Sequence, residues 1–268
     1  MTHSKVLLIG AGKMGGALLT AWQKADWPDG SVQVIETDSG QVKILSEKNT
    51  QVVSSVDQVM ESPACIVLAV KPQSMDELLP SLARKFGTHP LYLSIAAGKA
   101  LGYYEQHLGH AAAIVRAMPN TPALIGKGIS ALVANGNVNM RQKDLAAAVL
   151  GAAGEVVWLD DESQMDAVTA VSGSGPAYVF LFMEALVQAG VAQGLSEEIA
   201  KKLAMQTVLG ASELAKKSKE SLEQLRKNVT SPGGTTEAAL IKFMENDNFR
   251  TLIKFAVAEA VKRSKELA

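Results

Sequence analysis

The feature that most constrains the fold of this 268-residue chain is a glycine-rich turn placed directly after a strand-like segment. Residues 5–9 (KVLLI) form an apolar run typical of a buried parallel strand, and an apolar helix is expected from Gly15 through Trp22. Between them lies a G-x-G-x-x-G sequence, Gly10-Ala11-Gly12-Lys13-Met14-Gly15. The pattern alone is common, but its place between a strand and a helix makes it specific.

The three glycines have different expected tasks. Gly10 permits a tight turn, Gly12 lets a pyrophosphate approach the backbone, and Gly15 allows the helix to pack closely on the strand. The unpaired N–H groups at the helix start then face the phosphates. The sequence therefore predicts a dinucleotide site at this turn.

Glu36 ends the second predicted strand, residues 31–36. A carboxylate at this place binds the ribose 2′-hydroxyl and repels a 2′-phosphate, which favours NADH. Thr37 and Ser39 offer hydroxyls that can bind a phosphate, so NADPH stays open. The alternative is that Glu36 is a solvated charge at the strand end.

Strands alternate with helical segments over the first part of the chain, which predicts a parallel sheet covered on both faces. The strands are expected at residues 5–9, 31–36, 64–70, 90–95, 113–116, 130–134 and 156–159, with helices such as 74–85 and 142–153 between them. After Asp161 only helical periodicity is found, at residues 163–170, 176–193, 196–217, 221–228, 237–246 and 248–267. We expect an α/β chain, with a Rossmann-type doubly wound sheet in residues 1–160 and an all-helical domain in residues 161–268.

Composition limits the function. Hydrophobic residues are 47% and charged residues 20%, a globular balance, and a net charge of -1 gives no electrostatic case for nucleic acid or an anionic membrane. Cys65 is the single cysteine and lies in an apolar run, so we expect a core residue, no disulfide and a cytoplasmic location. The N-terminus shows no apolar signal region, and no Cys/His cluster predicts a metal.

The helical half is apolar on several faces, which predicts burial against a second subunit, with a monomeric bundle as the alternative. Its most apolar segment, residues 176–195, approaches the length of a membrane span. Glu184, Gln188 and Gln193 interrupt it, which favours a helix in a core or a subunit interface.

Two further groups of loops are candidate site walls. The turn Ala69-Val70-Lys71-Pro72 follows a strand and should border the cofactor, although Pro72 also explains the turn structurally. In the helical half, Ser172 and Ser174 lie in a glycine-rich entry to a long helix, with Ser174 a candidate N-cap.

A second glycine pair precedes another helix and predicts a receptor for a small anion such as a carboxylate. The segment reads Thr230-Ser231-Pro232-Gly233-Gly234-Thr235-Thr236. A well-capped helix start without a ligand is the alternative. No His or Lys base lies in these motifs, whereas reducing a C=N bond needs none, because the imine nitrogen can arrive protonated.

Together the motifs resemble the pyrroline-5-carboxylate reductase family. They are the glycine turn, Ala69 to Pro72, Ser94 to Gly98, RAMPNTP at 116–122, SGSGPAY at 172–178 and SPGGTT at 231–236. The resemblance implies reduction of pyrroline-5-carboxylate to proline by NADPH or NADH. It implies homodimers formed through the helical domains, which in many relatives assemble further into decamers.

The resemblance also implies roles for individual residues. The implied cofactor residues are Ile9, Gly10, Ala11, Gly12, Lys13, Met14, Ala69, Val70, Lys71, Pro72, Ile95, Ala96, Ala97 and Asn228. The backbone of Gly233, Gly234 and Thr235 is implied to bind the substrate carboxylate, and the Thr236 hydroxyl to reach the imine nitrogen. Glu36 departs from a family habit of preferring NADPH, and Lys219 stands where some relatives carry an acidic residue.

Two other functions stay open at this point. A hydroxy-acid or 6-phosphogluconate-type dehydrogenase would need a Lys in the substrate helix, and none occurs between Tyr178 and Lys201. A non-catalytic, dinucleotide-sensing oligomer would bind the cofactor without turnover.

Overall fold

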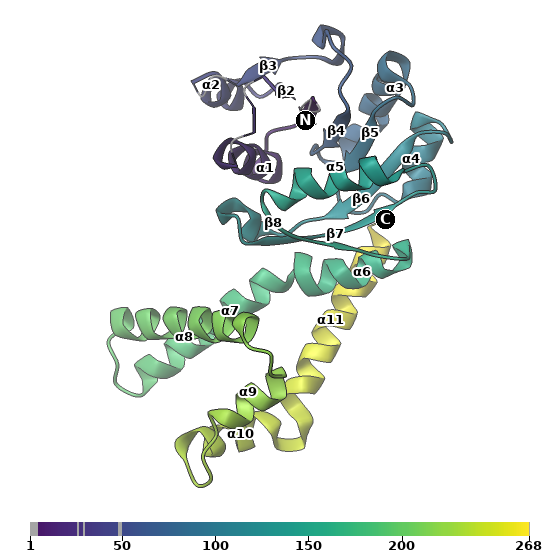
Figure 1. Cartoon of the computed structure of the whole chain (residues 1–268). Helices are drawn as coiled ribbons and strands as arrows, with labels where there is room; N and C mark the ends of the chain where they lie inside the picture. The colour runs from purple at the N-terminus through teal and green to yellow at the C-terminus, as the bar shows by residue number, and fades with distance from the viewer. Residues whose placement is uncertain (1–4, 26, 29, 48–49, 268) are drawn as a thin grey trace. The chain divides into compact units, whose positions relative to one another are not determined.

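The chain forms two compact units in a computed structural model that describes residues 5–25, 27–28, 30–47 and 50–267. One unit runs up to Gly173 and resumes at Ala260, and the other is Ser174–Glu259. All the described strands lie in the first unit (Figure 1). The last strand ends at Trp158 and the helical part begins at Glu162.

The first unit is built on one sheet in the order β3-β2-β1-β4-β5-β6-β7-β8. The strands are β1 (Val6–Ile9), β2 (Val32–Ile35), β3 (Gln51–Val53), β4 (Cys65–Leu68), β5 (Leu91–Ser94), β6 (Ala113–Met118), β7 (Gly128–Ala134) and β8 (Gly154–Trp158). Strands β1 to β6 run parallel, and the order reverses between β1 and β4. The expected doubly wound sheet is thus confirmed for these strands. The short strand β3 was not predicted.

One edge of the sheet departs from the expected parallel arrangement. Strand β7 pairs antiparallel with β6, and β8 pairs parallel with β7. Only a short segment with the 3-10 turn η3 (Thr121–Ile125) joins β6 to β7. A parallel return needs a crossover of about a dozen residues or more, which this connection does not supply.

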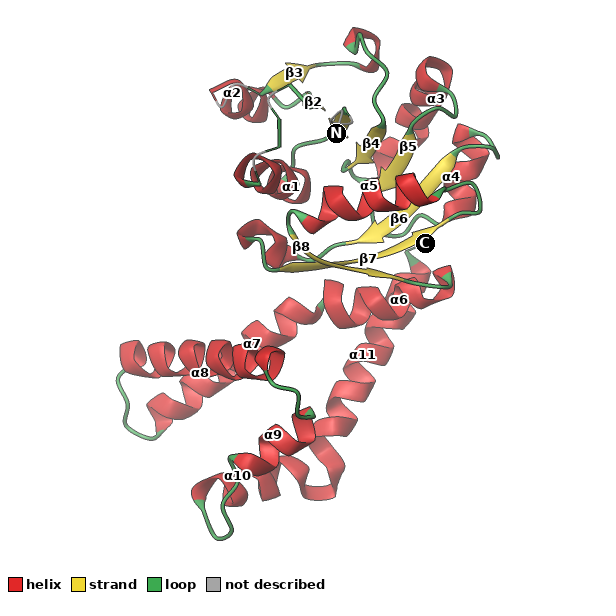
Figure 2. Ribbon diagram, viewed as in Figure 1, coloured by secondary structure: helices red, strands yellow, loops and turns green. Residues whose placement is uncertain are grey.

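Helices cover both faces of the sheet (Figure 2). Helices α1 (Lys13–Lys24), α2 (Ser39–Glu47) and α5 (Met140–Gly151) pack in one core cluster, and α3 (Met75–Phe86) and α4 (Leu101–Leu108) pack in the other. The indole Nε1 of Trp22 donates to the carbonyl oxygen of Val149 at 2.7 Å, which ties α1 to α5.

Cys65 lies in the core of this sheet, as the sequence predicted. Its side chain is fully buried on β4. Burial raises the pKa of the Cys65 thiol, because a thiolate would lose its hydration there. The residue is therefore a packing element rather than a nucleophile.

The helical part begins with three short turns rather than the single helix expected at residues 163–170. These are a 3-10 turn, η4 (Glu162–Gln164), a turn of α-helix, α6 (Met165–Val168), and a π-helical turn, η5 (Thr169–Gly173). The remaining elements agree with prediction to within a few residues. They are α7 (Gly175–Ala192), α8 (Glu197–Lys217), α9 (Leu222–Asn228), α10 (Thr235–Met244) and α11 (Asn248–Glu266). The 3-10 turn η6 (Glu245–Asp247), which was not predicted, joins the last two.

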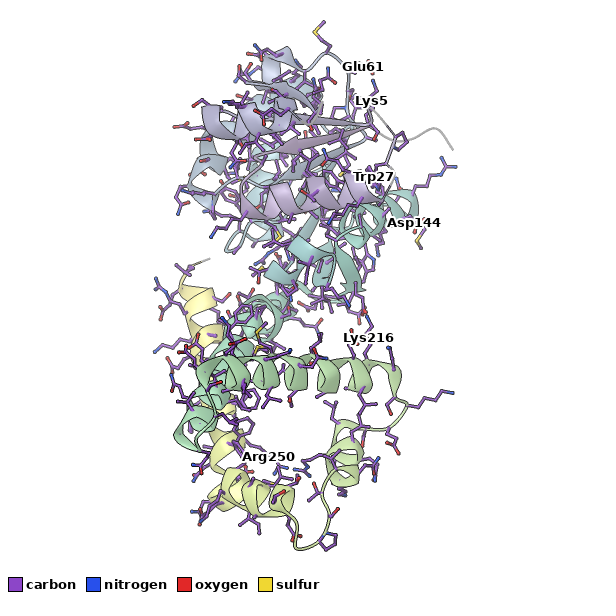
Figure 3. All side chains as sticks on the ribbon, turned by 90° about the vertical axis from the view of Figure 1, so that its left-hand side faces the viewer. Lys5, Trp27, Glu61, Asp144, Lys216 and Arg250 are labelled. Atoms are coloured by element: carbon purple, nitrogen blue, oxygen red, sulfur yellow. The ribbon has the colours of Figure 1, made fainter. Side chains whose placement is uncertain are left out.

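The unit Ser174–Glu259, whose side chains are drawn in Figure 3, exposes much apolar surface. No residue of α7 is buried, and Leu181 is 65% exposed. By length and composition alone, the helical stretch Glu162–Ala192 is long and apolar enough to cross a membrane, and only 6% of its most apolar part is buried. Burial within this chain therefore does not account for the hydrophobicity of α7.

Candidate functional site

The ends of four neighbouring strands form one row at the carboxyl edge of the sheet. Ile9 pairs in register with Ile35 on one side and with Leu68 on the other, and Leu68 pairs with Ser94. The residues that follow these strand ends are Glu36, Gly10, Ala69 and Ile95. The structure thus brings three predicted cofactor loops and Glu36 to one edge, at the point where the strand order reverses.

Two glycines of the turn are required by packing. Gly10 has φ +89°, and a Cβ there would lie 3.0 Å from both the carbonyl oxygen of Ala69 and Cγ1 of Val70. A Cβ at Gly15 would lie 2.1 Å from the carbonyl oxygen of Gly10. These contacts explain why the loops after β1 and β4 lie against each other.

Gly12 is different, because a Cβ there would meet no protein atom within 4 Å. Gly12 is the N-cap of α1, yet no side chain caps the helix and no acidic residue lies in its first turn. The N–H groups at the helix start, including those of Lys13 and Met14, have no intrahelical partner. An open glycine and an uncapped helix start fit a dinucleotide pyrophosphate, which would approach at this face.

The Glu36 carboxylate is half-buried and is held by the backbone. Its Oε2 accepts the backbone N–H of Ala11 at 2.7 Å. Its Oε1 accepts the N–H groups of Thr37 at 2.7 Å and Asp38 at 2.9 Å. Three backbone donors therefore hold this carboxylate against the glycine turn, beside the place predicted for the ribose.

The loop after β4 turns as the sequence predicted. Lys71 is exposed and occupies the N-cap position of the 3-10 turn η2 (Pro72–Ser74) without a side-chain cap hydrogen bond, and Pro72 is the first residue of the turn. Pro72 therefore ends the strand by fixing this turn.

A buried pair of hydroxyl groups stabilises the start of the loop after β5. The Ser94 and Tyr104 hydroxyls lie 2.6 Å apart, and the N–H of Ala96 donates to Ser94 Oγ at 3.3 Å. Burial raises the pKa of Tyr104, so the phenol stays neutral. Ile95 and Ala96 are buried and Ala97 is exposed, which leaves a small apolar wall at the sheet edge.

A second polar contact fixes the same loop and was missed in the sequence. Glu162 Oε1 accepts from Arg116 Nη1 at 2.8 Å and from the N–H of Leu101 at 2.9 Å. Arg116 is 8% exposed and the Glu162 side chain 28%, so the arginine end of this ion pair is shielded from water. No spacing rule links residue 162 to residues 101 and 116, and only the fold joins them.

The two serines of the glycine-rich entry lie in different compact units. Ser172 is part of the π-turn, and its hydroxyl donates to the carbonyl oxygen of Val168 at 3.0 Å. Ser174 occupies the N-cap position of α7, but its side chain makes no cap hydrogen bond, contrary to the expected role. Pro176 lies in the first helical turn, as predicted.

The glycine pair of the helical unit precedes α10, which begins at Thr235 rather than at Glu237. The Gly233 N–H donates to Glu237 Oε2 at 2.7 Å, and the Gly234 N–H donates to the carbonyl oxygen of Ser231 at 3.0 Å. Thr235 and Thr236 are exposed, and their N–H groups lie in the first turn of the helix. The segment predicted to bind a carboxylate therefore forms a helix start, and the N–H groups of Gly233 and Gly234 are engaged by the chain itself.

Asn228 and Lys219 are also in the helical unit. Asn228 ends α9, where its amide donates to Glu220 at 2.7 Å and accepts from Gln224 at 2.8 Å. Lys219 lies in the exposed turn between α8 and α9. Asn228 is thus oriented by its own unit.

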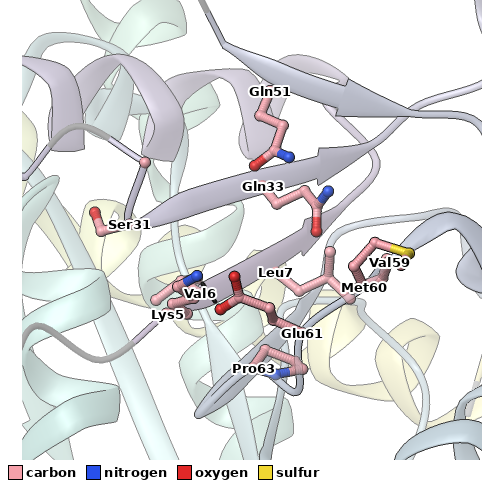
Figure 4. A pocket seen from close by; sticks show the side chains of 11 residues that line it. Lys5, Val6, Leu7, Ser31, Gln33, Gln51, Val59, Met60, Glu61 and Pro63 are labelled. Carbon is pink, nitrogen blue, oxygen red and sulfur yellow. Dashed lines mark hydrogen bonds and ion pairs between the residues drawn. The ribbon is translucent and has the colours of Figure 1, made fainter.

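A small cavity of about 60 Å³ lies at the opposite, amino edge of the sheet (Figure 4). It is lined by residues that precede or begin the strands, and the ion pair between Lys5 and Glu61 borders it. Its position separates it from the loops described above. Among residues 5–25, 27–28, 30–47 and 50–267, no group of three or more His, Cys, Asp or Glu residues is arranged to hold a metal ion.

The doubly wound sheet and the open glycine turn at its switch point define a dinucleotide-binding protein of the Rossmann class. Residues 5–98 match the family described as NADP oxidoreductase coenzyme F420-dependent. Residues 162–267 match the family described as Pyrroline-5-carboxylate reductase dimerisation.

Individual pyrroline-5-carboxylate reductases are similar to this chain over its whole length. A pyrroline-5-carboxylate reductase of Pseudomonas aeruginosa is 42% identical over 269 residues, which cover 100% of this chain and 98% of the relative. The solved pyrroline-5-carboxylate reductase of Coxiella burnetii has a TM-score of 0.94 at 38% identity, covering 100% of this chain and 99% of that chain. The Plasmodium falciparum enzyme, solved with NADP bound, has a TM-score of 0.85 at 33% identity with the same coverage.

The chain therefore belongs to the pyrroline-5-carboxylate reductase family and is an NAD(P)H-dependent oxidoreductase. The resemblance in the motifs is confirmed by these comparisons. A hydroxy-acid or 6-phosphogluconate-type dehydrogenase is excluded as the family of this chain.

Proposed function

We propose that this chain reduces the C=N bond of 1-pyrroline-5-carboxylate to give L-proline, the final step of proline biosynthesis, with NADPH or NADH as the reductant. The observation that carries the proposal is sequence identity, 42% and 37% over the full length of this chain, to two relatives that carry this name. The residues at the sheet edge and in the helical unit supply a physical reason for it.

The bound dinucleotide supplies a hydride to the imine carbon. For the chain itself, we propose that Ile9 to Gly15, Ala69 to Pro72 and Ile95 to Ala97 bind the cofactor, with Asn228 near its ribose or nicotinamide end. The uncapped start of α1 and the open face of Gly12 support the pyrophosphate contact. The buried Ile95 and Ala96 offer an apolar wall for a flat ring.

The substrate contacts are proposed from the start of α10. The N–H groups of Gly233 to Thr235 bind the carboxylate, and the Thr236 hydroxyl hydrogen-bonds the ring nitrogen. A helix start is favourable for an anion, because its free N–H groups and its dipole attract negative charge. We assign Ser172 and Ser174 to the same substrate site on the family resemblance.

The proposed reaction needs no side chain that donates or removes a proton. The imine nitrogen enters protonated, the hydride bonds to the imine carbon, and the electron pair of the C=N bond moves to nitrogen. The product is a neutral amine that takes a proton from water. A hydroxyl at Thr236 suffices to orient the nitrogen, so the lack of a His or Lys base in these motifs is understandable.

We further propose that two copies associate through their helical units, and that dimers can assemble into decamers. The support is the apolar surface of α7, none of which is buried within this chain, and the dimerisation family that residues 162–267 match. Burial of α7 against a second copy also accounts for its hydrophobicity without a membrane, which agrees with a cytoplasmic enzyme.

The test is an assay of dinucleotide oxidation with 1-pyrroline-5-carboxylate, run separately with NADH and NADPH. We expect oxidation that depends on the imine, with one proline formed for each dinucleotide consumed. A protein that binds the dinucleotide but oxidises neither form would be the non-catalytic sensor instead.

A further inference from the structure

Glu237 holds one of the donors that the substrate carboxylate would use. It lies in the first turn of α10, and its Oε2 accepts the backbone N–H of Gly233 at 2.7 Å. Gly233 has φ +72°, a conformation that favours glycine, and a Cβ there would meet nothing within 4 Å. A carboxylate of the chain thus already sits on the predicted carboxylate receptor.

The Glu237 carboxylate accepts fewer hydrogen bonds than the Glu36 carboxylate. Three backbone N–H groups hold Glu36, whereas one holds Glu237. Within the described parts of the chain, no cation pairs with Glu237. Moving this side chain away therefore breaks one hydrogen bond on an exposed loop, which a flexible glutamate can do at modest cost.

We propose that Glu237 is an internal competitor of the substrate carboxylate and so sets the KM for carboxylate-bearing imines. Without substrate, it satisfies the Gly233 N–H and keeps the loop formed. When substrate binds, the two carboxylates require the same donor and repel each other, so Glu237 must withdraw. This inference rests on the proposed function, because it assumes that the start of α10 binds the substrate carboxylate.

The experiment compares Glu237→Gln with wild type on two imines, 1-pyrroline-5-carboxylate and 1-pyrroline, which lacks the carboxylate. We expect the KM for 1-pyrroline-5-carboxylate to fall about three- to tenfold, since a neutral amide competes less well than a carboxylate. We expect kcat to change by less than about twofold and the KM for 1-pyrroline to stay the same.

Two further variants complete the design. Glu237→Ala removes the competitor at a helical position that alanine tolerates well, and should shift KM in the same direction. Glu245→Gln is the matched control, because Glu245 follows α10 at its other end, where it pairs with Lys242 at 3.3 Å. The control removes the same charge and should leave both constants unchanged.

Three results separate the possibilities. An unchanged or higher KM for 1-pyrroline-5-carboxylate in both Glu237 variants would show that Glu237 only caps the loop, and would overturn the inference. An equal fall in KM for 1-pyrroline would also overturn it, because the effect would not concern the carboxylate. The activity of the wild-type protein on 1-pyrroline-5-carboxylate tests the proposed function separately. If the wild type does not reduce this imine, both the proposed function and the role of Glu237 are wrong.

Discussion

The side-chain amide of Asn120 donates to the backbone carbonyl oxygen of Ser172 at 3.1 Å, and it accepts the N–H of Ile129 at 2.9 Å. Asn120 is 9% exposed, so both bonds are shielded from water. Ser172 belongs to the π-turn that ends the first compact unit, and π-turns often occur at functional sites. Asn120 therefore links the start of β7 to the π-turn that contains Ser172.

Asn120→Ala should lower the free energy of unfolding by about 1–3 kcal/mol, because it leaves a buried N–H and a carbonyl without their partner. Urea unfolding followed by circular dichroism measures this difference. The exposed Thr88→Ala serves as control and should change stability by less than about 0.5 kcal/mol. Equal stability of Asn120→Ala and wild type would mean that water replaces the amide.

Thr236→Ala should reduce turnover of 1-pyrroline-5-carboxylate about tenfold or more, since one lost hydrogen bond to the reacting nitrogen is typically worth ~1.4 kcal/mol or above. The affinity for the dinucleotide should barely change. Steady-state kinetics with the two substrates varied independently give both quantities, with Thr88→Ala again as control. Wild-type turnover in the variant would remove Thr236 from the mechanism.

Glu36→Ala should improve the KM for NADPH more than the KM for NADH. A carboxylate ~4 Å from a 2′-phosphate costs roughly 1 kcal/mol in water and about 4 kcal/mol at an effective dielectric of 20. Removing it also frees the N–H groups of Ala11, Thr37 and Asp38, which can then bind the phosphate. We expect the wild type to use both cofactors. If the ratio of the two KM values does not change in the variant, Glu36 does not face the ribose.

The assembly proposal is tested by placing a charge on α7. Leu181→Asp should weaken self-association about tenfold or more, because burying a leucine is worth about 1.5–3 kcal/mol and a buried carboxylate costs more. Leu124→Asp is the matched control, since Leu124 is 54% exposed in the other compact unit. Sedimentation velocity over a range of concentrations compares the two. Equal association of both variants would place the interface away from α7.

Much of the local structure at the candidate site could be predicted because local patterns encode it. The glycine turn, Glu36 at the end of β2 and the SPGGTT segment each join a special backbone requirement to a predictable helix or strand. Periodicity does not encode strand direction, so the antiparallel pairing of β7 with β6 was missed.

Other features depend on contacts between distant residues. Glu162 reaches Leu101 and Arg116 only because the fold places η4 beside β6 and α4. The Glu237 contact was missed although its signal is local: a glutamate in the first turn after a glycine N-cap resembles a capping box.

The central claim is that the chain transfers a hydride to the imine carbon, and isotope transfer tests it most directly. The enzyme is incubated with 1-pyrroline-5-carboxylate and NADH or NADPH that carries deuterium on the transferable position of its nicotinamide C4. We predict proline with one deuterium on its δ-carbon, the former imine carbon, as detected by mass spectrometry and NMR. Proline without deuterium, or deuterium at the carbon that bears the carboxylate, would contradict the account.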